Sequence, residues 1–302
     1  MKKELLANTM GLLARAGFYV SEICTIRPSS FDFVARRDNT LLMVKVLNNI
    51  DALSEDVAKE LLLLAKYLDG IPVLIGNRTS SGPLEDETLY CRYKVPIMTY
   101  ETLNDCLQGV MPIICAAPGG LYANMDGSKI KELREKKSIS LGQLAWAAGV
   151  SRRTIRMYEM GERATIEVAE KIGAFLGEEI LKPIDLMEFI SNYELEIERN
   201  INDDMLSMIK SMGISILPTS RSPFNAISEL VDELLLVSVN DRRIIERAHI
   251  ISNVSKVVEK HSVFFIEYSS KKNIEGIPVI EKKELYRIDE PVGLLDLIRE
   301  RE

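Results

Sequence analysis

Four residues able to contact DNA bases stand within five positions: Arg152, Arg153, Thr154 and Arg156. A guanidinium carries paired N–H donors that match the O6 and N7 acceptors of guanine in the major groove. The threonine adds a methyl group and a hydroxyl, which suit a thymine methyl group or a phosphate. These residue types at this spacing predict that one short segment contacts base edges in DNA.

The elements that must position these side chains are two short helices joined by a tight turn. Ser140 and Ser151 are good N-caps, and Gly149 stands where the first helix must end in a left-handed residue. In the second helix, residues 152–159, Ile155 faces inward while the arginines face out. The pattern predicts a helix-turn-helix. Apolar residues recur at helical spacing in the first helix at Leu141, Leu144, Ala145 and Ala148.

The flanking segments 130–137 and 164–177 also have helical patterns. Residues 144–161 follow the pattern L-A-x-x-x-G-V-S-x-x-T-I-x-x-Y-E-x-G, and the region resembles the lambda-repressor/Cro-like DNA-binding domain. The alternative is a four-helix bundle with a chance turn motif. The sequence departs from the family at Leu141, where a phosphate-contacting glutamine is frequent. Trp146 is interpreted as buried packing or a partner face rather than a base-stacking residue.

The resemblance implies separate roles for two sets of residues. Contacts to bases are expected from Arg152, Arg153, Thr154 and Arg156. Contacts to the DNA backbone are expected from Lys136, Lys137, Ser140, Ser151 and Arg163. Arg153→Ala should therefore relax preference at one base pair, whereas Lys137→Ala should weaken binding to all sequences alike.

Charge favours a local nucleic-acid surface. Residues 128–176 hold 10 Lys and Arg against 6 Asp and Glu, a net +4, whereas the rest of the chain holds 28 against 39, a net −11. A basic island in an acidic protein is the footprint of a DNA-binding domain. Because a net charge of +4 is modest, we expect tight binding to need two such domains, supplied by a homodimer on a two-fold symmetric DNA site.

Composition indicates a multidomain globular protein. The length of 302 residues suggests two or three domains, and 46% hydrophobic residues suffice for buried cores. There is no apolar run long enough for a signal peptide or a membrane span. The four cysteines lack C-x-x-C spacing, which argues against a zinc site or a disulfide framework and favours a reducing cytoplasm.

A second candidate site lies near the N-terminus, where the patterns predict the order α-β-β-β-α-β-β-α. Asp32 lies on a predicted strand at 31–35 and Lys45 on the next, at 41–47. This arrangement resembles the restriction-endonuclease-like fold, particularly archaeal Holliday-junction resolvases, in which an Asp and an acid-x-Lys triplet hold a divalent metal. Here the triplet reads Met43-Val44-Lys45. A thioether in place of the second carboxylate predicts a vestigial site without metal or catalysis.

The C-terminal third repeats this pattern. Residues 222–239 align with residues 29–46 without a gap, with Asn225 in place of Asp32 and Ser238 in place of Lys45. We interpret this as a degenerate internal repeat, the alternative being two unrelated α/β halves. The fold class expected is therefore multidomain, with two α/β, restriction-endonuclease-like units flanking an all-α, lambda-repressor-like helix-turn-helix domain.

The arrangement resembles archaeal helix-turn-helix transcriptional regulators. The domains expected are an inactive nuclease-like unit at 1–111, an ordered connector at 112–127, the DNA-binding domain at 128–190 and a second inactive unit at 191–302. The resemblance implies a sequence-specific, repressor-like regulator of double-stranded DNA that is not an enzyme, needs no cofactor and has no membrane partner. Two alternatives remain: a nuclease using Asp32 and Lys45, and an antitoxin-like interaction module. A small-molecule effector is not indicated by any residue.

Overall fold

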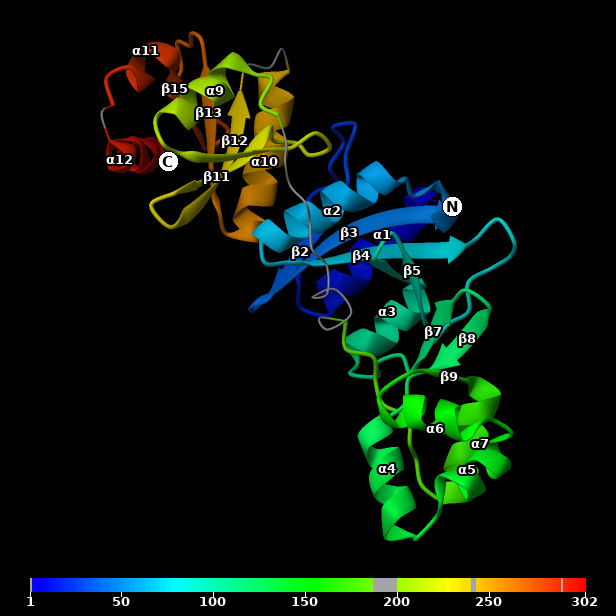
Figure 1. Cartoon of the computed structure of the whole chain (residues 1–302). Coiled ribbons are helices and arrows are strands. Elements are labelled where there is room, and N and C mark those ends of the chain that lie inside the picture. Colours follow the sequence, from blue (N-terminus) through cyan, green and yellow to red (C-terminus); the bar gives the residue numbers. More distant parts are fainter. Residues whose placement is uncertain (1, 187–199, 240–242, 289) are drawn as a thin grey trace. The chain divides into compact units, whose positions relative to one another are not determined.

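Figure 1 shows the computed structural model, which describes residues 2–186, 200–239, 243–288 and 290–302. The chain forms two compact units. The first comprises Met1–Val46, Leu53–Val73 and Glu194–Glu302, and the second comprises Leu47–Ala52 and Leu74–Tyr193.

The N-terminal part of the first unit is an α/β structure. Its elements are α1 (Lys2–Arg15), β1 (Tyr19–Val20), β2 (Phe33–Arg37), β3 (Thr40–Asn49), α2 (Glu55–Tyr67) and β4 (Ile71–Arg78). Strands β1, β2 and β3 are antiparallel neighbours, and β3 lies beside β4. Residues 41–46 of β3 are all buried, as expected of a strand covered on both faces. Asp38, at φ 51°, and Asn39 make the predicted hairpin turn.

The C-terminal part of the first unit contains a sheet of its own. Its elements are α9 (Asp204–Ser211), β10 (Ser215–Pro218), β11 (Ala226–Leu230), β12 (Glu233–Val239), α10 (Ile244–Val258), β13 (His261–Ile266), β14 (Asn273–Ile274), β15 (Ile277–Glu281), α11 (Lys282–Leu285) and α12 (Pro291–Arg301). The six strands have the order β10-β11-β12-β13-β15-β14. One apolar core joins the sheet to α9 and α12.

Element order and register coincide between the two ends of the chain. The strand order β1-β2-β3-β4-β6-β5 matches β10-β11-β12-β13-β15-β14. Residue 225 corresponds to residue 32, an offset of 193. The equivalent hydrogen bonds are Asp32 N–H to Val44 O and Asn225 N–H to Val237 O, each 2.8 Å, together with Val46 N–H to Asp32 Oδ2 at 2.9 Å and Val239 N–H to Asn225 Oδ1 at 3.2 Å.

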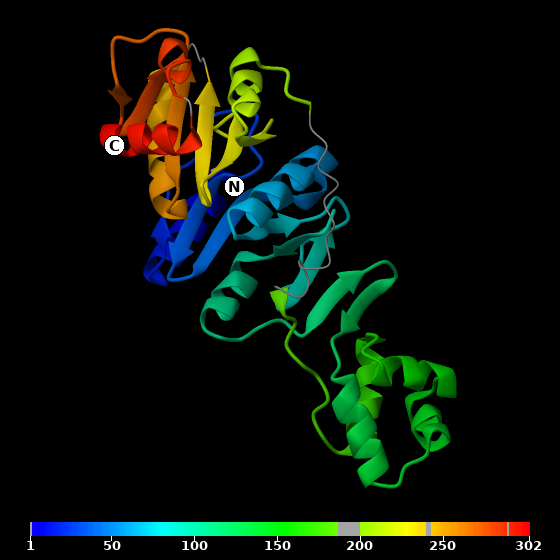
Figure 2. The same ribbon diagram turned by 60° about the vertical axis from the view of Figure 1, so that its left-hand side comes forward.

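Within the first unit, α10 packs against β2 (Figure 2). Arg36 of β2 donates from Nε to the carbonyl of Val257 at 2.7 Å and from Nη2 to that of Val258 at 3.0 Å. These carbonyls belong to the last turn of α10, where a cation is favoured by the helix dipole. The arginine therefore fixes the end of α10 on the N-terminal sheet.

The two halves of this unit also exchange equivalent contacts. Each half makes these contacts with two residues that lie four positions apart on one helix. In the N-terminal half they are Asp56 and Glu60 of α2, and in the C-terminal half they are His249 and Asn253 of α10. Each pair contacts the segment that follows the first strand of the other half. The contacts are Arg221 Nη2 to Asp56 Oδ2 at 3.2 Å, Ser220 N–H to Glu60 Oε1 at 3.0 Å, His249 Nε2 to Glu22 Oε2 at 3.0 Å and Glu22 N–H to Asn253 Oδ1 at 2.6 Å. This reciprocity is the property of a two-fold symmetric interface.

The second unit joins strands to a helical domain. Its elements are η1 (Ile50–Ala52), β5 (Thr88–Arg92), β6 (Val95–Met98), α3 (Tyr100–Leu107), β7 (Ile114–Ala117), β8 (Gly120–Ala123), α4 (Gly127–Lys136), α5 (Leu141–Ala148), α6 (Arg152–Glu159), β9 (Ala164–Thr165) and α7 (Ile166–Leu176). The strand order is β4-β6-β5-β7-β8-β9. Helices α4 to α7 share one core (Figure 1), and β9 pairs with β8.

Several boundaries differ from the sequence-based expectations. Strand β5 was missed, and the strand expected from Phe31 begins at Phe33. The domain predicted as all-α contains β9, because Ala164 and Thr165 pair with β8 before α7 begins. Residues 182–185, near the end of the predicted DNA-binding domain, are not helical, and residues 187–190 of that domain lie outside the described residues.

One ion pair in the C-terminal part should give a pH signature. Hydrogen bonds from Arg301 hold the pKa of Glu284 at about 2, below its ordinary 4.5. A carboxyl whose pKa is depressed by folding stabilises the fold above its ordinary pKa and loses that contribution as the pH falls through the folded value. The stability difference between wild type and Glu284→Gln should therefore shrink from pH 4.5 towards about 2. Urea unfolding of the two proteins at several pH values measures this; a constant difference would contradict it.

Candidate nucleic-acid interface and vestigial nuclease site

The turn between α5 and α6 has the geometry predicted from its residues. Gly149 adopts the left-handed conformation at φ 71° and ψ 29°, and Val150 N–H donates to the Ala145 carbonyl at 2.9 Å. The Ser151 hydroxyl accepts from Thr154 N–H at 3.0 Å and so begins α6. Ser140 and Gln143 form a capping box at the start of α5.

Helix α6 presents its cations on the side opposite the core. Ile155 is completely buried, whereas Arg152, Arg153 and Arg156 are exposed. Thr154 is half-buried and its hydroxyl lies 2.8 Å from that of Ser151. The four residues predicted to contact bases therefore lie on one helix, three of them exposed.

A buried ion pair fixes α6 against α4. Arg134 Nε lies 2.6 Å from Glu159 Oε1 and its Nη2 lies 3.3 Å from Oε2, so the pair is bidentate. The side chains are only 12% and 8% exposed. Arg134 also donates to the Ile139 carbonyl at 3.3 Å, and its hydrogen bond with Glu159 raises its pKa. Sequence reasoning missed this pair, because no spacing rule links residues on different helices.

Gly127 permits a close approach of the same two helices. A Cβ at this position would lie 2.4 Å from the Tyr158 carbonyl oxygen and 2.8 Å from that of Glu159. Only a glycine leaves room for the end of α6 against the start of α4. Asp126, which precedes it, is the N-cap of α4.

The residues expected to contact the DNA backbone are dispersed over the domain. Lys136 is exposed at the end of α4. Lys137 donates to the Leu176 carbonyl and so caps the C-terminus of α7. Ser140 and Ser151 are N-caps. Arg163 lies after α6, beside Cys115.

Trp146 on α5 is 85% exposed, which excludes the buried alternative for this residue and leaves the partner-face interpretation.

The position predicted to be a vestigial nuclease site holds a buried carboxylate beside three cationic side chains. Asp32 is completely buried. Its Oδ1 lies 3.4 Å from Lys2 Nζ and 3.3 Å from Arg27 Nη2, and its Oδ2 lies 3.7 Å from Lys45 Nζ. Lys45 also donates to the Ser29 carbonyl at 2.8 Å, and burial lowers its pKa. Met43 is completely buried on the same strand.

This group of side chains does not fit the divalent metal that the resemblance implies. A hard cation requires several oxygen ligands, whereas the Asp32 carboxylate lies beside the positive charges of Lys2, Arg27 and Lys45. In the C-terminal half, Asn225 Oδ1 accepts instead from Val239 N–H at 3.2 Å and Arg247 Nη1 at 3.0 Å. Over the described ranges, no group of three or more His, Cys, Asp or Glu residues could hold a metal ion. No helix among them is long and apolar enough to cross a membrane.

Two family models match segments of this chain. A family model described as a PD-(D/E)XK superfamily domain matches residues 2–112, and one described as a helix-turn-helix matches residues 130–182. The restriction-endonuclease-like and helix-turn-helix predictions for these segments are confirmed. No solved structure matches the chain.

Full-length relatives occur in archaea. The chain is 41% identical to a protein of Methanococcoides burtonii, over 100% of this chain and 98% of the relative. It is 40% identical to one of Methanosarcina mazei, over 99% and 98%, and 32% identical to one of Archaeoglobus fulgidus, over 100% and 99%. Each is named, provisionally, an HTH-type transcriptional regulatory protein. The chain belongs to this family. In this member of the family, the matches place a PD-(D/E)XK superfamily domain before a helix-turn-helix.

Proposed function

We propose that this regulator recognises specific DNA sequences by placing α6 in the major groove. The observation that carries the proposal is the helix itself: Ile155 is anchored in the core while Arg152, Arg153 and Arg156 are exposed together. Arginine is the residue most often used to read guanine in this groove. Thr154 completes the proposed set of base contacts, and the name of the family supports the function.

The phosphate contacts are proposed around this helix. Lys136 is exposed, and the N-termini of α5 and α6 begin at Ser140 and Ser151, where backbone N–H groups favour anions. Lys137 already holds the end of α7, so its removal would change stability as well as DNA affinity. Lys136 is therefore the cleaner residue with which to test a phosphate contact.

We propose that two chains bind a two-fold symmetric site in the cytoplasm. The support is electrostatic: a net +4 on residues 128–176 supplies few phosphate contacts, so a second domain would be needed for tight binding. The flanking regions, 1–111 and 191–302, are proposed to be α/β units that are degenerate copies of one another. Their common register and strand order support this.

We further propose that neither unit cleaves DNA. The support is the substitution of the second carboxylate by Met43 and the three cations around Asp32. The second unit has the amide of Asn225 and the hydroxyl of Ser238 at the equivalent positions.

The experiment that tests the proposal is selection of genomic fragments by the purified full-length protein at about 150 mM salt with Mg²⁺ present. The salt concentration is fixed because it sets the affinity for non-specific DNA. Enrichment of a two-fold symmetric motif on intact fragments is expected. Cleaved fragments would instead identify a nuclease. Absence of enrichment would favour an interaction module, in which the exposed Trp146 would be a contact residue.

Arg153→Ala should cost about 1–3 kcal/mol of binding free energy at the selected site and relax preference at one base pair. The reason is the loss of a bidentate contact to one base. Lys136→Ala should weaken binding to specific and to random DNA equally, and should reduce the dependence of that binding on salt concentration. Fluorescence anisotropy on both DNAs at several salt concentrations measures this. Equal losses on the two DNAs for Arg153→Ala would remove this residue from the set that reads bases.

A further inference from the structure

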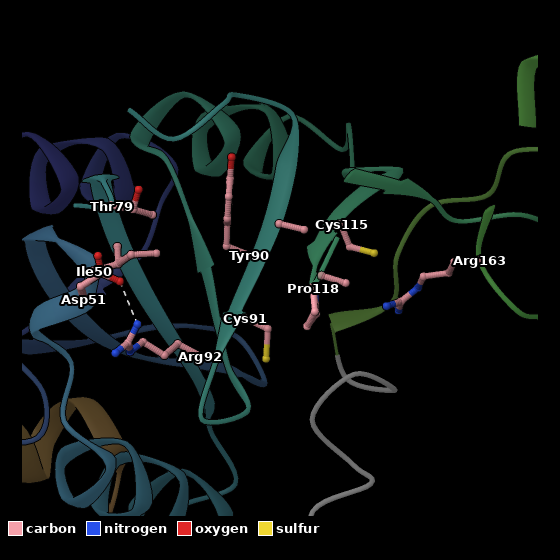
Figure 3. A pocket seen from close by; sticks show the side chains of 11 residues that line it. Ile50, Asp51, Thr79, Tyr90, Cys91, Arg92, Cys115, Pro118 and Arg163 are labelled. Carbon is pink, nitrogen blue, oxygen red and sulfur yellow. Dashed lines mark hydrogen bonds and ion pairs between the residues drawn. The ribbon is translucent and has the colours of Figure 1, made fainter. Parts of the chain in front are cut away.

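The second unit contains a cavity outside the DNA-binding helix and outside the vestigial nuclease site. Its volume is about 540 Å³, which lies in the range of pockets that hold small organic molecules. Figure 3 shows that its walls come from η1, Thr79 directly after β4, β5, β7 and the segment after α6. The lining combines apolar surface from Ile50, Tyr90 and Pro118 with the guanidinium groups of Arg92 and Arg163.

Arg92 is held in place by an ion pair, and one of its buried N–H groups has no hydrogen-bond partner among the described residues. Arg92 Nη1 lies 2.8 Å from Asp51 Oδ1, and Asp51 Oδ2 accepts from Ser80 N–H at 2.7 Å. The Nε–H of Arg92 is buried and has no acceptor among the described residues. A buried donor without a partner is costly, and an acceptor oxygen that reached it would relieve that cost.

The other arginine, Arg163, adds positive charge to a lining in which Asp51 supplies the one carboxylate among the described residues. Arg163 points into the cavity towards β7 (Figure 3), and its charge opposes the rise in the pKa of the Cys115 thiol that burial causes. Cys91, on the neighbouring strand β5, also lines the wall. The charge of Asp51 balances only one of the two guanidinium groups. With the thiols neutral, the residues that line the cavity therefore carry a net charge of +1.

We propose that this cavity binds a small organic anion, with its carboxylate or phosphate oxygens on Arg163 and its apolar part against Pro118, while Arg92 is turned towards Asp51 (Figure 3) and adds positive charge to the wall. The excess positive charge selects the anionic group, and the apolar wall selects a molecule larger than an inorganic ion. Arg163 directly precedes β9 and follows the last turn of α6 by three residues. An occupant of the cavity therefore contacts the segment that leads out of the recognition helix.

The test uses the thiols and needs no DNA, so its failure is distinct from failure of the proposed regulator function. Cys91 is exposed and lines the cavity, whereas Cys106 lies on α3 outside the lining and serves as an internal reference. Alkylation of the full-length protein by iodoacetamide at about pH 8.5 is followed by mass spectrometry at each cysteine. Because burial raises the pKa of both thiols, that of Cys106 to about 11, each rate is divided by the rate of the same cysteine without a probe. The probes are phenyl phosphate, benzoate and the neutral benzyl alcohol.

An anionic probe at a concentration of roughly twice its Kd should slow the alkylation of Cys91 about threefold relative to the alkylation of Cys106. Protection by phenyl phosphate, by benzoate or by both identifies the preferred anionic group. Arg163→Gln should abolish the protection, whereas Arg153→Gln, a matched change on an exposed arginine of α6, should retain it. The proposal is overturned if neither anion protects Cys91, if benzyl alcohol protects it equally, or if protection persists in Arg163→Gln.

Discussion

Replacing Arg134 by methionine is expected to cost about 3–5 kcal/mol of stability in the helix-turn-helix, because a partner of a buried ion pair is removed and the other is left uncompensated. Glu159 is only 8% exposed and would keep its charge without its bidentate partner. The loss should appear as faster hydrogen exchange in α4 and α6, measured by mass spectrometry on the full chain. Exchange in the C-terminal sheet, β10 to β15, should not change.

Two further variants make this prediction specific. Arg134→Met combined with Glu159→Met should recover most of the lost stability, because apolar pairs replace buried ion pairs at little cost. Lys171→Met removes an exposed partner of Glu167 in α7 and should leave exchange as in wild type. If Arg134→Met behaves like Lys171→Met, the pair does not hold α6 in place.

Asp32→Ala is expected to destabilise the first unit by about 3–5 kcal/mol, because it leaves Lys45 as a buried charge without its counterion. It also removes the acceptor of the Val46 N–H, which lies 2.9 Å from the carboxylate. Urea denaturation of the full chain followed by circular dichroism measures the loss. In an active nuclease of this fold the aspartate would be a metal ligand, whereas here we assign it to stability.

Comparison with Asn225 supplies the control. Asp32→Asn should lose less stability than Asp32→Ala, because an amide oxygen can still accept from Val46 as Asn225 accepts from Val239. Asn225→Ala should cost about 1–3 kcal/mol, the usual penalty for an unsatisfied buried donor. If Asp32→Ala is as stable as the wild type, the three cations do not need the carboxylate as a counterion, and the prediction is contradicted.

The local parts of this molecule could be predicted from its sequence because their signals are short-range. Gly149 and Ser151 define the turn through backbone conformation and capping, and both behave as expected. The alignment of residues 222–239 with 29–46 predicted a repeat, and the strands of both segments pair in the same register, although the repeat itself stays a prediction. The vestigial site predicted from the triplet Met43-Val44-Lys45 also stays a prediction.

The missed features depend on contacts between distant residues. Nothing near Asp32 in sequence indicated that Lys2 would reach its carboxylate. The two residues of β9 carry no strand pattern and pair only because β8 lies alongside. The cavity wall that includes Asp51 and Arg163 comes from segments more than 100 residues apart, so no spacing rule could bring them together.

The reciprocal contacts of α2 and α10 have a consequence for how this protein can change. In a pair of identical subunits, every substitution at a symmetric interface or at an equivalent interior position occurs twice. Here both halves belong to one polypeptide, so position 32 can retain a carboxylate while position 225 carries an amide. If the two halves are copies of one unit, as proposed, each is free to diverge as long as its opposite half still fits, and the helix-turn-helix at residues 130–182 is shared by both.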